Sequence, residues 1–181
     1  METDEVETLQ NLRSCREILQ DLFEQHGGRV FNTAGDSVLG EFSSAVSAVV
    51  CASEFQNLIN EKNRSDDKTY NLEFRIGINM GDVVNKDGNL IGDGVNIAAR
   101  LEALAQPNGI TISKSVYDFV VPKTKITFND LGIQKVKQNE FHAFDVLLDP
   151  SQRRSSITRA KINVFALSSF VLFSVLLLGF I

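Results

Sequence analysis

The sequence predicts an α+β domain, in which one sheet carries helices, followed by a single C-terminal transmembrane helix. Two observations support this prediction. Helix-like and strand-like segments alternate through residues 1–149 and include hairpins, which is typical of a mixed sheet with helices packed on it. Residues 163–181 then read NVFALSSFVLFSVLLLGFI, without a charge or a proline. The 181 residues therefore divide into a domain at 1–149, a basic linker at 150–162 and an apolar segment at 163–181.

Helices are expected where apolar residues recur every three to four positions. Gly27 and Gly28 end the first of them, because glycine readily adopts the conformations that follow a helix. Ser43 or Ser44 caps the second, since a serine hydroxyl accepts a hydrogen bond from a free N–H of the first turn. The expected helices are 4–26, 45–59, 96–105 and 115–120.

Strands are expected in the short apolar and β-branched runs between these helices, each bounded by turn residues. Gly35-Asp36 separates the first two runs and predicts a β-hairpin, whereas the polar stretch 60–70 predicts a loop. The expected strands are 29–35, 37–42, 71–80, 83–85, 110–113, 125–133 and 141–148.

Composition and charge disfavour several classes of protein. Hydrophobic residues make up 43% and charged residues 23% of the chain, a globular balance that argues against disorder. The formal net charge of −5 disfavours nucleic-acid binding, which uses an excess of Lys and Arg. Two cysteines are too few for a disulfide framework and suit a reducing compartment.

The apolar segment 163–181 is expected to cross a membrane. Its 19 residues would form a helix roughly 28 Å long, close to the hydrocarbon thickness of a bilayer. A buried core helix is the less favoured alternative, because such a helix seldom runs this long without a polar face. The bases before the segment mark its cytoplasmic side, and the segment is either a tail anchor or part of a longer chain. These bases are Arg153, Arg154, Arg159 and Lys161.

Three features of the domain are candidates for chemistry, and each has an ordinary structural alternative. Asp36 offers the carboxylate oxygens that Mg²⁺ prefers, although Gly-Asp is also common turn chemistry. Asn96 and Arg100 share a helix face that could orient a sugar and bind phosphate, or could be an ordinary solvated face. The turn at 91–94, with sequence IGDG, allows close approach of a phosphate, but the motif alone is weak evidence.

In this order and spacing the three features resemble the catalytic domain of class III adenylate and guanylate cyclases, of the bacterial type. The resemblance is carried by GGRVFNTAGDSVLGEF, FRIGINMGDVV and IGDGVNIAARLEALAQPNGITIS, and it covers almost all of residues 1–148. It implies a ferredoxin-like sheet with added elements and a head-to-tail homodimer with active sites at the interface. It also implies conversion of a purine nucleoside triphosphate into the 3′,5′-cyclic monophosphate and pyrophosphate, with two Mg²⁺ or Mn²⁺ ions per site. Because the resemblance is to the bacterial type, the apolar segment of this chain is expected to lie in a bacterial inner membrane, with the cyclase-like domain in the cytoplasm.

The resemblance further implies roles for single residues. Asp36 matches the second of the family's two metal-binding aspartates. Asn96 matches the asparagine that positions the ribose, and Arg100 matches the arginine that stabilises the transition state; both are expected to act with Asp36 of the opposite protomer. Lys137 lies where the family often has a triphosphate-binding lysine, and a solvated lysine at a strand end is an equal alternative.

The sequence departs from the family pattern in its metal ligands. The family's first metal aspartate lies on a strand before the first helix, whereas METDEVETLQ already resembles the start of that helix. Lack of this strand would leave an interior position of the sheet unpaired. A single carboxylate does not easily hold two ions. The alternative function is therefore a catalytically inactive dimerisation or nucleotide-sensing module anchored to the membrane.

A second departure concerns the purine pocket. Asn32 and Asn89 stand where adenylate cyclases of this family typically have Lys and Asp. Each amide offers both a donor and an acceptor to a purine edge, but neither supplies charge. ATP is the expected substrate because most bacterial relatives use it, and GTP is the alternative.

Overall fold

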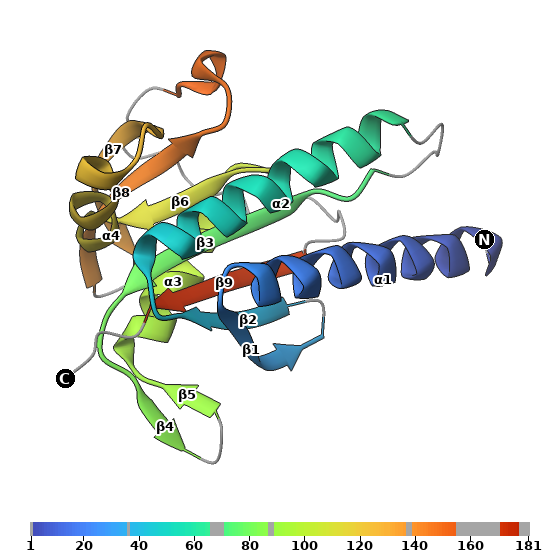
Figure 1. Ribbon diagram of the computed structural model, residues 1–181, viewed down its shortest axis with the longest axis horizontal. Helices are drawn as coiled ribbons and strands as arrows, with labels where there is room; N and C mark the ends of the chain where they lie inside the picture. The colour runs from blue at the N-terminus through green and yellow to red at the C-terminus, as the bar shows by residue number, and fades with distance from the viewer. Residues whose placement is uncertain are drawn as a thin grey trace.

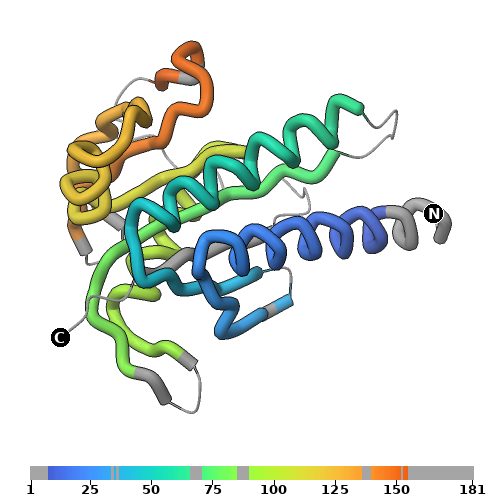
Figure 2. Tube along the Cα trace, in the orientation of Figure 1, coloured from blue at the N-terminus to red at the C-terminus, as the bar shows by residue number. Residues whose placement is uncertain are grey.

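The computed structural model describes residues 2–35, 37–65, 71–86, 89–136, 139–154 and 171–177. Within these ranges, side chains are described except at 2–7, 34, 85, 86, 89, 136, 139, 152 and 171–177 (Figure 2, grey). Two of the predicted site residues, Asp36 and Lys137, therefore lie outside the described residues.

The chain folds into a mixed sheet with helices on its two faces (Figure 1). The helices are α1 (Glu2–Gln25), α2 (Ala45–Ser65), α3 (Asp93–Leu104) and α4 (Lys114–Val120), with 3₁₀ turns at Val121–Lys123 and Pro150–Gln152. The strands are β1 (Gly28–Ala34), β2 (Ser37–Phe42), β3 (Phe74–Met80), β4 (Val84–Lys86), β5 (Asn89–Ile91), β6 (Ile110–Ser113), β7 (Thr127–Val136), β8 (Asn139–Leu147) and β9 (Val171–Leu177). The large sheet has the order β1-β2-β9-β3-β6-β8-β7, and β4 pairs with β5 in a separate ribbon.

The predicted α+β class is confirmed, and the predicted helices and hairpin lie close to the observed elements. The prediction of a loop at 60–70 is wrong for 60–65, because α2 continues to Ser65. Two basic side chains in the last turn of α2 suit the negative end of the helix dipole. Asn63 Nδ2 also donates a hydrogen bond to the carbonyl of Leu72 at 2.9 Å. These contacts lengthen a helix whose polar end resembles a loop in the sequence.

The prediction of a transmembrane helix over 163–181 is wrong for residues 171–177. These residues form β9, which lies between β2 and β3 and pairs in parallel with both (Figure 1). A strand between two others reads as a continuous apolar run, which periodicity does not distinguish from a helix. No helix in the described part of the chain is long and apolar enough to cross a bilayer. Residues 163–170 and 178–181 lie outside the described residues.

The sequence predicts an unpaired interior position in the sheet, and β9 occupies an interior position between β2 and β3. Its backbone pairs with Val38–Phe42 of β2 on one side and with Phe74–Met80 of β3 on the other. Unpaired backbone groups inside a sheet are costly. The C-terminal segment therefore supplies ladder partners to two strands that belong to the core of the domain.

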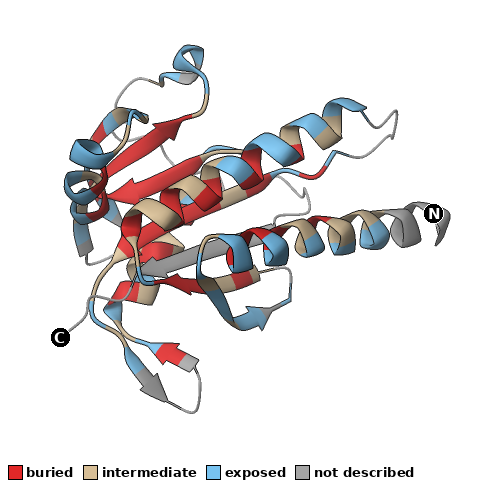
Figure 3. Ribbon diagram, in the orientation of Figure 1, coloured by how far each residue is buried: buried red, intermediate tan, exposed pale blue. Residues whose placement is uncertain are grey.

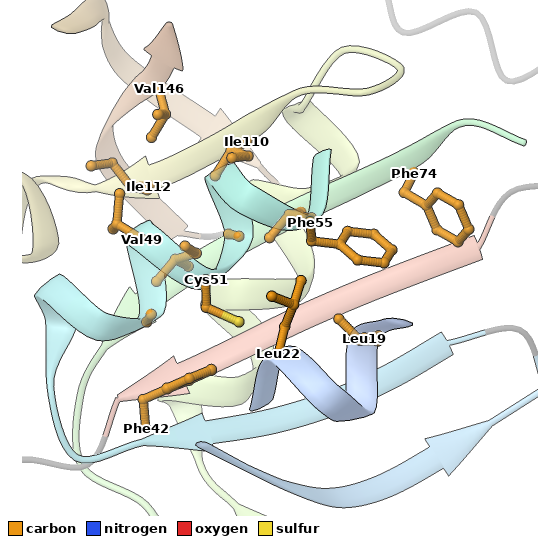
Figure 4. Close-up of a cluster of buried hydrophobic side chains, with 14 of the residues drawn as sticks. Leu19, Leu22, Phe42, Val49, Cys51, Phe55, Phe74, Ile110, Ile112 and Val146 are labelled. Carbon is orange, nitrogen blue, oxygen red and sulfur yellow. The ribbon is translucent and has the colours of Figure 1, made fainter. Parts of the chain in front are cut away.

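The main core lies between the sheet and the helices α1, α2 and α4, and Figure 3 marks buried residues in red on the helices and on the strands. Phe55 of α2 and Phe74 of β3 meet edge to face there, with ring centroids 5.1 Å apart (Figure 4). Side chains alternate along β3, so Ile76 and Ile78 enter this core while Gly77 faces α3 on the other side of the sheet.

Candidate functional site

Helix α3 carries two predicted site residues and is held against the sheet by a glycine. A Cβ on Gly77 of β3 would lie 2.1 Å from the carbonyl oxygen of Ala98 and 2.3 Å from the amide nitrogen of Glu102. Because these are backbone atoms, they cannot rotate away. At the start of the helix, Nδ2 of the buried Asn79 donates to the carbonyl of Gly94 at 3.1 Å. These two contacts set both the position and the rotation of α3.

Asn96 and Arg100 lie on the face of α3 that points away from the sheet. The buried residues of the helix include Gly94, Ala98 and Leu101, which share its inner face. Since each residue turns the helix by about 100°, positions 96 and 100 lie on the opposite side. Asn96 is exposed and Arg100 is partly buried. The predicted shared face of these two side chains is therefore present in the structure.

Arg100 provides a cationic group whose hydrogen-bonding capacity is incompletely used. Its Nη1 atom is buried and has no hydrogen-bond partner within the described residues. A buried polar atom without a partner is costly, and an anionic oxygen would satisfy it with a strong, charge-assisted hydrogen bond. The outer face of α3 thus fits a ligand that brings an anion to Arg100 and a hydrogen-bonding group to Asn96.

A small apolar cluster brings the hairpin and the ribbon to α3. Phe31 of β1 packs against a cluster formed by Leu90 of β5 and Ala98 of α3. Asn32 follows Phe31 and is exposed, and Asn89 precedes Leu90, although its side chain is not described. The strand register shifts at Phe31, as at a β-bulge, which can re-aim a neighbouring side chain. The two predicted purine-binding positions therefore lie on elements that converge on α3.

The predicted metal site cannot be assembled from the described residues. Of the hairpin tip, Gly35 is described, and its carbonyl accepts a hydrogen bond from Arg16 Nη2 at 2.6 Å. Asp36 and Lys137 lie outside the described residues. Among the described residues there is no group of three or more His, Cys, Asp or Glu side chains able to hold a metal ion. The described side chains by themselves do not fit the two-ion site that the resemblance implies.

A cavity of about 480 Å³ lies beside the start of α3, and its lining includes Asp93, Lys114 and His142 but neither Asn96 nor Arg100. Sequence reasoning did not single out Lys114 or His142, because neither lies in a recognisable motif. Each already has a carboxylate partner. On the outer face of α3, in contrast, Asn96 is exposed and Arg100 is partly buried, with its Nη1 atom unpartnered within the described residues.

Sequence reasoning also missed the residues that hold α3 in place. Gly77 and Asn79 lie within the motif FRIGINMGDVV, but the motif drew attention only as part of the resemblance. A glycine inside a strand often marks the close approach of another backbone. Gly77 between Ile76 and Ile78 therefore indicated that another backbone packs closely here, but it did not indicate that this backbone belongs to α3.

Comparison with known proteins identifies the family. The family described as "Adenylate and Guanylate cyclase catalytic domain" matches residues 1–148 of this chain. A Rhizobium meliloti (strain 1021) protein with the name "Putative adenylate cyclase 3" is 44% identical over 141 residues, which are 77% of this chain and 24% of that protein. The chain thus spans about a quarter of the length of this curated relative.

Solved structures share the fold. The adenylate/guanylate cyclase/hydrolase from Silicibacter pomeroyi has a TM-score of 0.72 at 36% identity, covering 81% of this chain and 87% of that chain. The adenylyl cyclase CyaB from P. aeruginosa has a TM-score of 0.64 at 23% identity, covering 78% and 83% of the two chains, and shows the fold alone. These likenesses confirm the predicted cyclase fold with a mixed sheet and flanking helices. This chain belongs to the adenylate and guanylate cyclase catalytic domain family.

Proposed function

We propose that this domain converts ATP into 3′,5′-cyclic AMP and pyrophosphate, as one half of a homodimeric site. The outer face of α3 is the observation that carries the proposal. There Asn96 lies one turn before Arg100, whose Nη1 atom is buried and without a partner within the described residues. A sugar hydroxyl next to a polyphosphate suits an amide beside a guanidinium. Family membership supplies the class of reaction.

In the proposed reaction the ribose 3′-oxygen attacks the α-phosphorus of the same nucleotide. The new bond joins the 3′-oxygen to the α-phosphorus, and the bond from the α-phosphorus to the β-phosphate oxygen breaks. Pyrophosphate leaves with that electron pair, and the 3′-hydroxyl proton passes to solvent. Negative charge grows on the phosphoryl oxygens, where the guanidinium of Arg100 offsets it. Asn96 holds the ribose so that the attacking oxygen is in line with the leaving group.

The family uses divalent metal ions, and Asp36 is the residue of this sequence that matches one of its metal ligands. Bound Mg²⁺ or Mn²⁺ would lower the pKa of the 3′-hydroxyl and neutralise phosphate charge. Asp36 lies outside the described residues, and the described side chains include no cluster that holds a metal ion. The roles proposed for Asn96 and Arg100 therefore include no step through the metal.

A second copy of the chain is proposed to complete the site, with Asp36 of one copy facing Arg100 of the other. The β4–β5 ribbon projects from the domain (Figure 1). Val84 and Ile91 are paired across this ribbon and are 68% and 55% exposed. Exposed apolar side chains that lie together favour an interface between proteins.

ATP is proposed over GTP on the basis of a relative. The Rhizobium meliloti protein, 44% identical over 141 residues, carries the name "Putative adenylate cyclase 3". Asn32 and Asn89 carry neutral amides, which can hydrogen-bond either purine. Initial rates with ATP and with GTP, measured side by side, test the choice, and a faster rate with GTP would reverse it.

Turnover by the full chain with Mn²⁺ tests the catalytic proposal. Arg100→Ala is expected to lower kcat by about 100- to 1,000-fold, because the transition-state charge loses its cation. Arg100→Lys is expected to restore only part of the rate, since an ammonium lacks the planar fork of a guanidinium. Arg13→Ala is the matched control, because Arg13 on α1 is 85% exposed and pairs with Glu17. Equal rates in Arg100→Ala and Arg13→Ala would reject the role of Arg100.

The alternative function is a nucleotide-sensing module without turnover. It is favoured by Asn32 and Asn89, whose neutral amides stand where adenylate cyclases of the family typically have Lys and Asp. Calorimetric titration of the chain with ATP and Mn²⁺, followed by chromatography of the same sample, separates the two functions. Binding heat with no cyclic nucleotide formed would establish the sensing module and reject the enzyme.

The location of the chain at a bacterial inner membrane stays a prediction from 163–181 and is independent of the catalytic proposal. Residues 171–177 form β9 inside the sheet, and the same residues cannot span a bilayer while they do so. Fractionation of cells that express the full chain tests this prediction. Recovery from the membrane pellet after an alkaline wash would support it, and complete recovery from the soluble fraction would reject it.

A further inference from the structure

Arg154 lies shortly after β8, and its side chain turns back towards that strand. Only 15% of this side chain is exposed. The sequence pattern places Arg154 with the bases that precede a membrane span, where its charge would face lipid headgroups or water. The structure instead uses the guanidinium inside the protein, whereas the neighbouring Arg153 is exposed.

The guanidinium of Arg154 joins β8 to α3, and side chains of β6 and β7 bind its carboxylate partner and its backbone carbonyl. Its Nε and Nη2 atoms donate to the two carboxylate oxygens of Asp145 on β8, at 2.5 and 2.8 Å. Nη2 also donates to the carbonyl oxygen of Leu104 at 3.0 Å. The hydroxyl of Thr111 on β6 donates to the same Asp145 carboxylate at 2.7 Å. Asn129 Nδ2 on β7 donates to the backbone carbonyl of Arg154 at 2.8 Å.

The contact with Leu104 matters because Leu104 is the last residue of α3. Carbonyl groups at the C-terminal end of a helix lack partners within the helix, and a cation there interacts favourably with the helix dipole. Arg154 therefore caps the helix that bears Asn96 and Arg100. Arg100 lies one turn before the capped residue, so movement at this end of α3 reaches it directly.

We propose that Arg154 is a positioning residue, which holds the last turn of the catalytic helix α3 against β8. This proposal rests on the proposed function of Arg100. While the guanidinium holds both Asp145 and Leu104, the last turn of α3 is held against β8. Without this guanidinium the cap is lost, and the last turn of α3 loosens. A misplacement of Arg100 by about 1 Å is enough to slow the reaction strongly.

Two variants of Arg154 separate positioning from folding. Arg154→Ala removes the cap but leaves the Asp145 carboxylate buried without its partner, which destabilises the domain as well. The combined variant Thr111→Val, Asp145→Leu and Arg154→Met removes the cap together with the whole polar group. Replacing a buried ion pair by apolar residues of similar volume is commonly tolerated. Arg153→Ala is the matched control, because this neighbouring arginine is exposed.

Amide hydrogen exchange of the full chain tests the cap without using turnover. Peptides that cover residues 99–105 are expected to exchange about tenfold faster in both Arg154 variants than in Arg153→Ala, because the last turn of α3 frays. Peptides from α1 are expected to exchange at the same rate in the combined variant and the control. Unchanged exchange at 99–105 would overturn the proposal.

Kinetics test whether the cap acts on the reaction. The combined variant is expected to lower kcat about tenfold with KM for ATP within about twofold. Adding Arg100→Ala to the combined variant is expected to cause no loss beyond that of Arg100→Ala alone, because Arg154 acts through Arg100. Faster exchange with an unchanged kcat would overturn the positioning role. A wild-type chain without cyclase activity would reject the proposed function, while the exchange data would still decide whether the cap exists.

Discussion

The backbone of Gly77 on β3 lies directly against the carbonyl oxygen of Ala98 on α3, so closely that a Cβ on Gly77 would come within 2.1 Å of that oxygen. This contact sets the distance between the helix and the sheet and the direction in which the outer face of α3 points. The roles proposed for Asn96 and Arg100 both depend on that direction.

Gly77→Ala is expected to lower both stability and turnover. The added methyl group meets backbone atoms that cannot rotate away, so α3 must move outward. Overpacking of this kind costs about 1–3 kcal/mol. Urea denaturation measures the loss of stability, and ATP turnover below the unfolding transition measures the displacement of Arg100.

The control for this substitution is Gly81→Ala. The nearest atoms to a Cβ on Gly81 lie 3.5 Å away, which is an ordinary van der Waals contact. Gly81→Ala is expected to unfold at the urea concentration of the unmodified chain. If Gly77→Ala also unfolds there and keeps its turnover, the close contact does not position α3.

Val84→Lys and Ile91→Lys are expected to weaken the proposed homodimer. The two side chains are paired across the β4–β5 ribbon and are mostly exposed in the single chain. A charge placed in the core of an interface must lose its hydration, which costs binding free energy. Sedimentation velocity is expected to show more monomer, and specific activity is expected to recover as the protein concentration rises. Leu58→Lys on α2, where the native leucine is 38% exposed, is the control, and equal dimerisation in all three variants would reject this interface.

Val175→Pro tests the strand β9. Val175 pairs with Gly40 of β2 and Ile78 of β3, so its amide belongs to an interior strand. Proline removes that N–H and does not fit the middle of a sheet. We expect a loss of about 2–4 kcal/mol in the free energy of unfolding, measured by urea denaturation. Val175→Thr keeps the amide and the β-branch, and equal unfolding of the two variants would place 171–177 outside the sheet.

Cys51 is expected to make folding sensitive to alkaline pH. Burial of this thiol, and then the nearby carboxylate of Glu54, raise its pKa from 9.0 to about 12. A pKa raised by folding contributes stability that is complete below the unfolded pKa and is lost as pH rises towards the folded value. The free energy of unfolding should therefore fall between pH 9.0 and about 12. Urea denaturation across this range checks the fall, and Cys51→Ala should flatten it; identical slopes would contradict this role.

Much of the domain could be predicted from local patterns in the sequence. Helix α1, the β1–β2 hairpin and α3 each follow from periodicity, turn residues or a Gly-rich start, which act within a few residues of one another. The shared face of Asn96 and Arg100 follows from a spacing of four on a helix. Because these features depend on neighbouring residues alone, they could be predicted without knowledge of the tertiary structure.

Two other features could not be predicted in this way. The buried position of Arg154 depends on Asp145 and on Leu104, which is fifty positions earlier in the chain. The continuation of α2 to Ser65 depends on the contact of Asn63 with Leu72. In both cases a polar side chain donates a hydrogen bond to a backbone carbonyl elsewhere in the chain. The sequence around each side chain nevertheless resembles an ordinary solvated segment.

By itself, the sequence determined the class of domain, the order of its helices and the helix face that Asn96 shares with Arg100, because these depend on short-range periodicity and turn chemistry. Only the tertiary structure decided which way α3 faces, through Gly77, and where residues 171–177 lie. An apolar run satisfies its backbone equally well in a helix or between two strands. Its pairing with β2 and β3 is a contact between distant parts of the chain, and no pattern within the run itself specifies it.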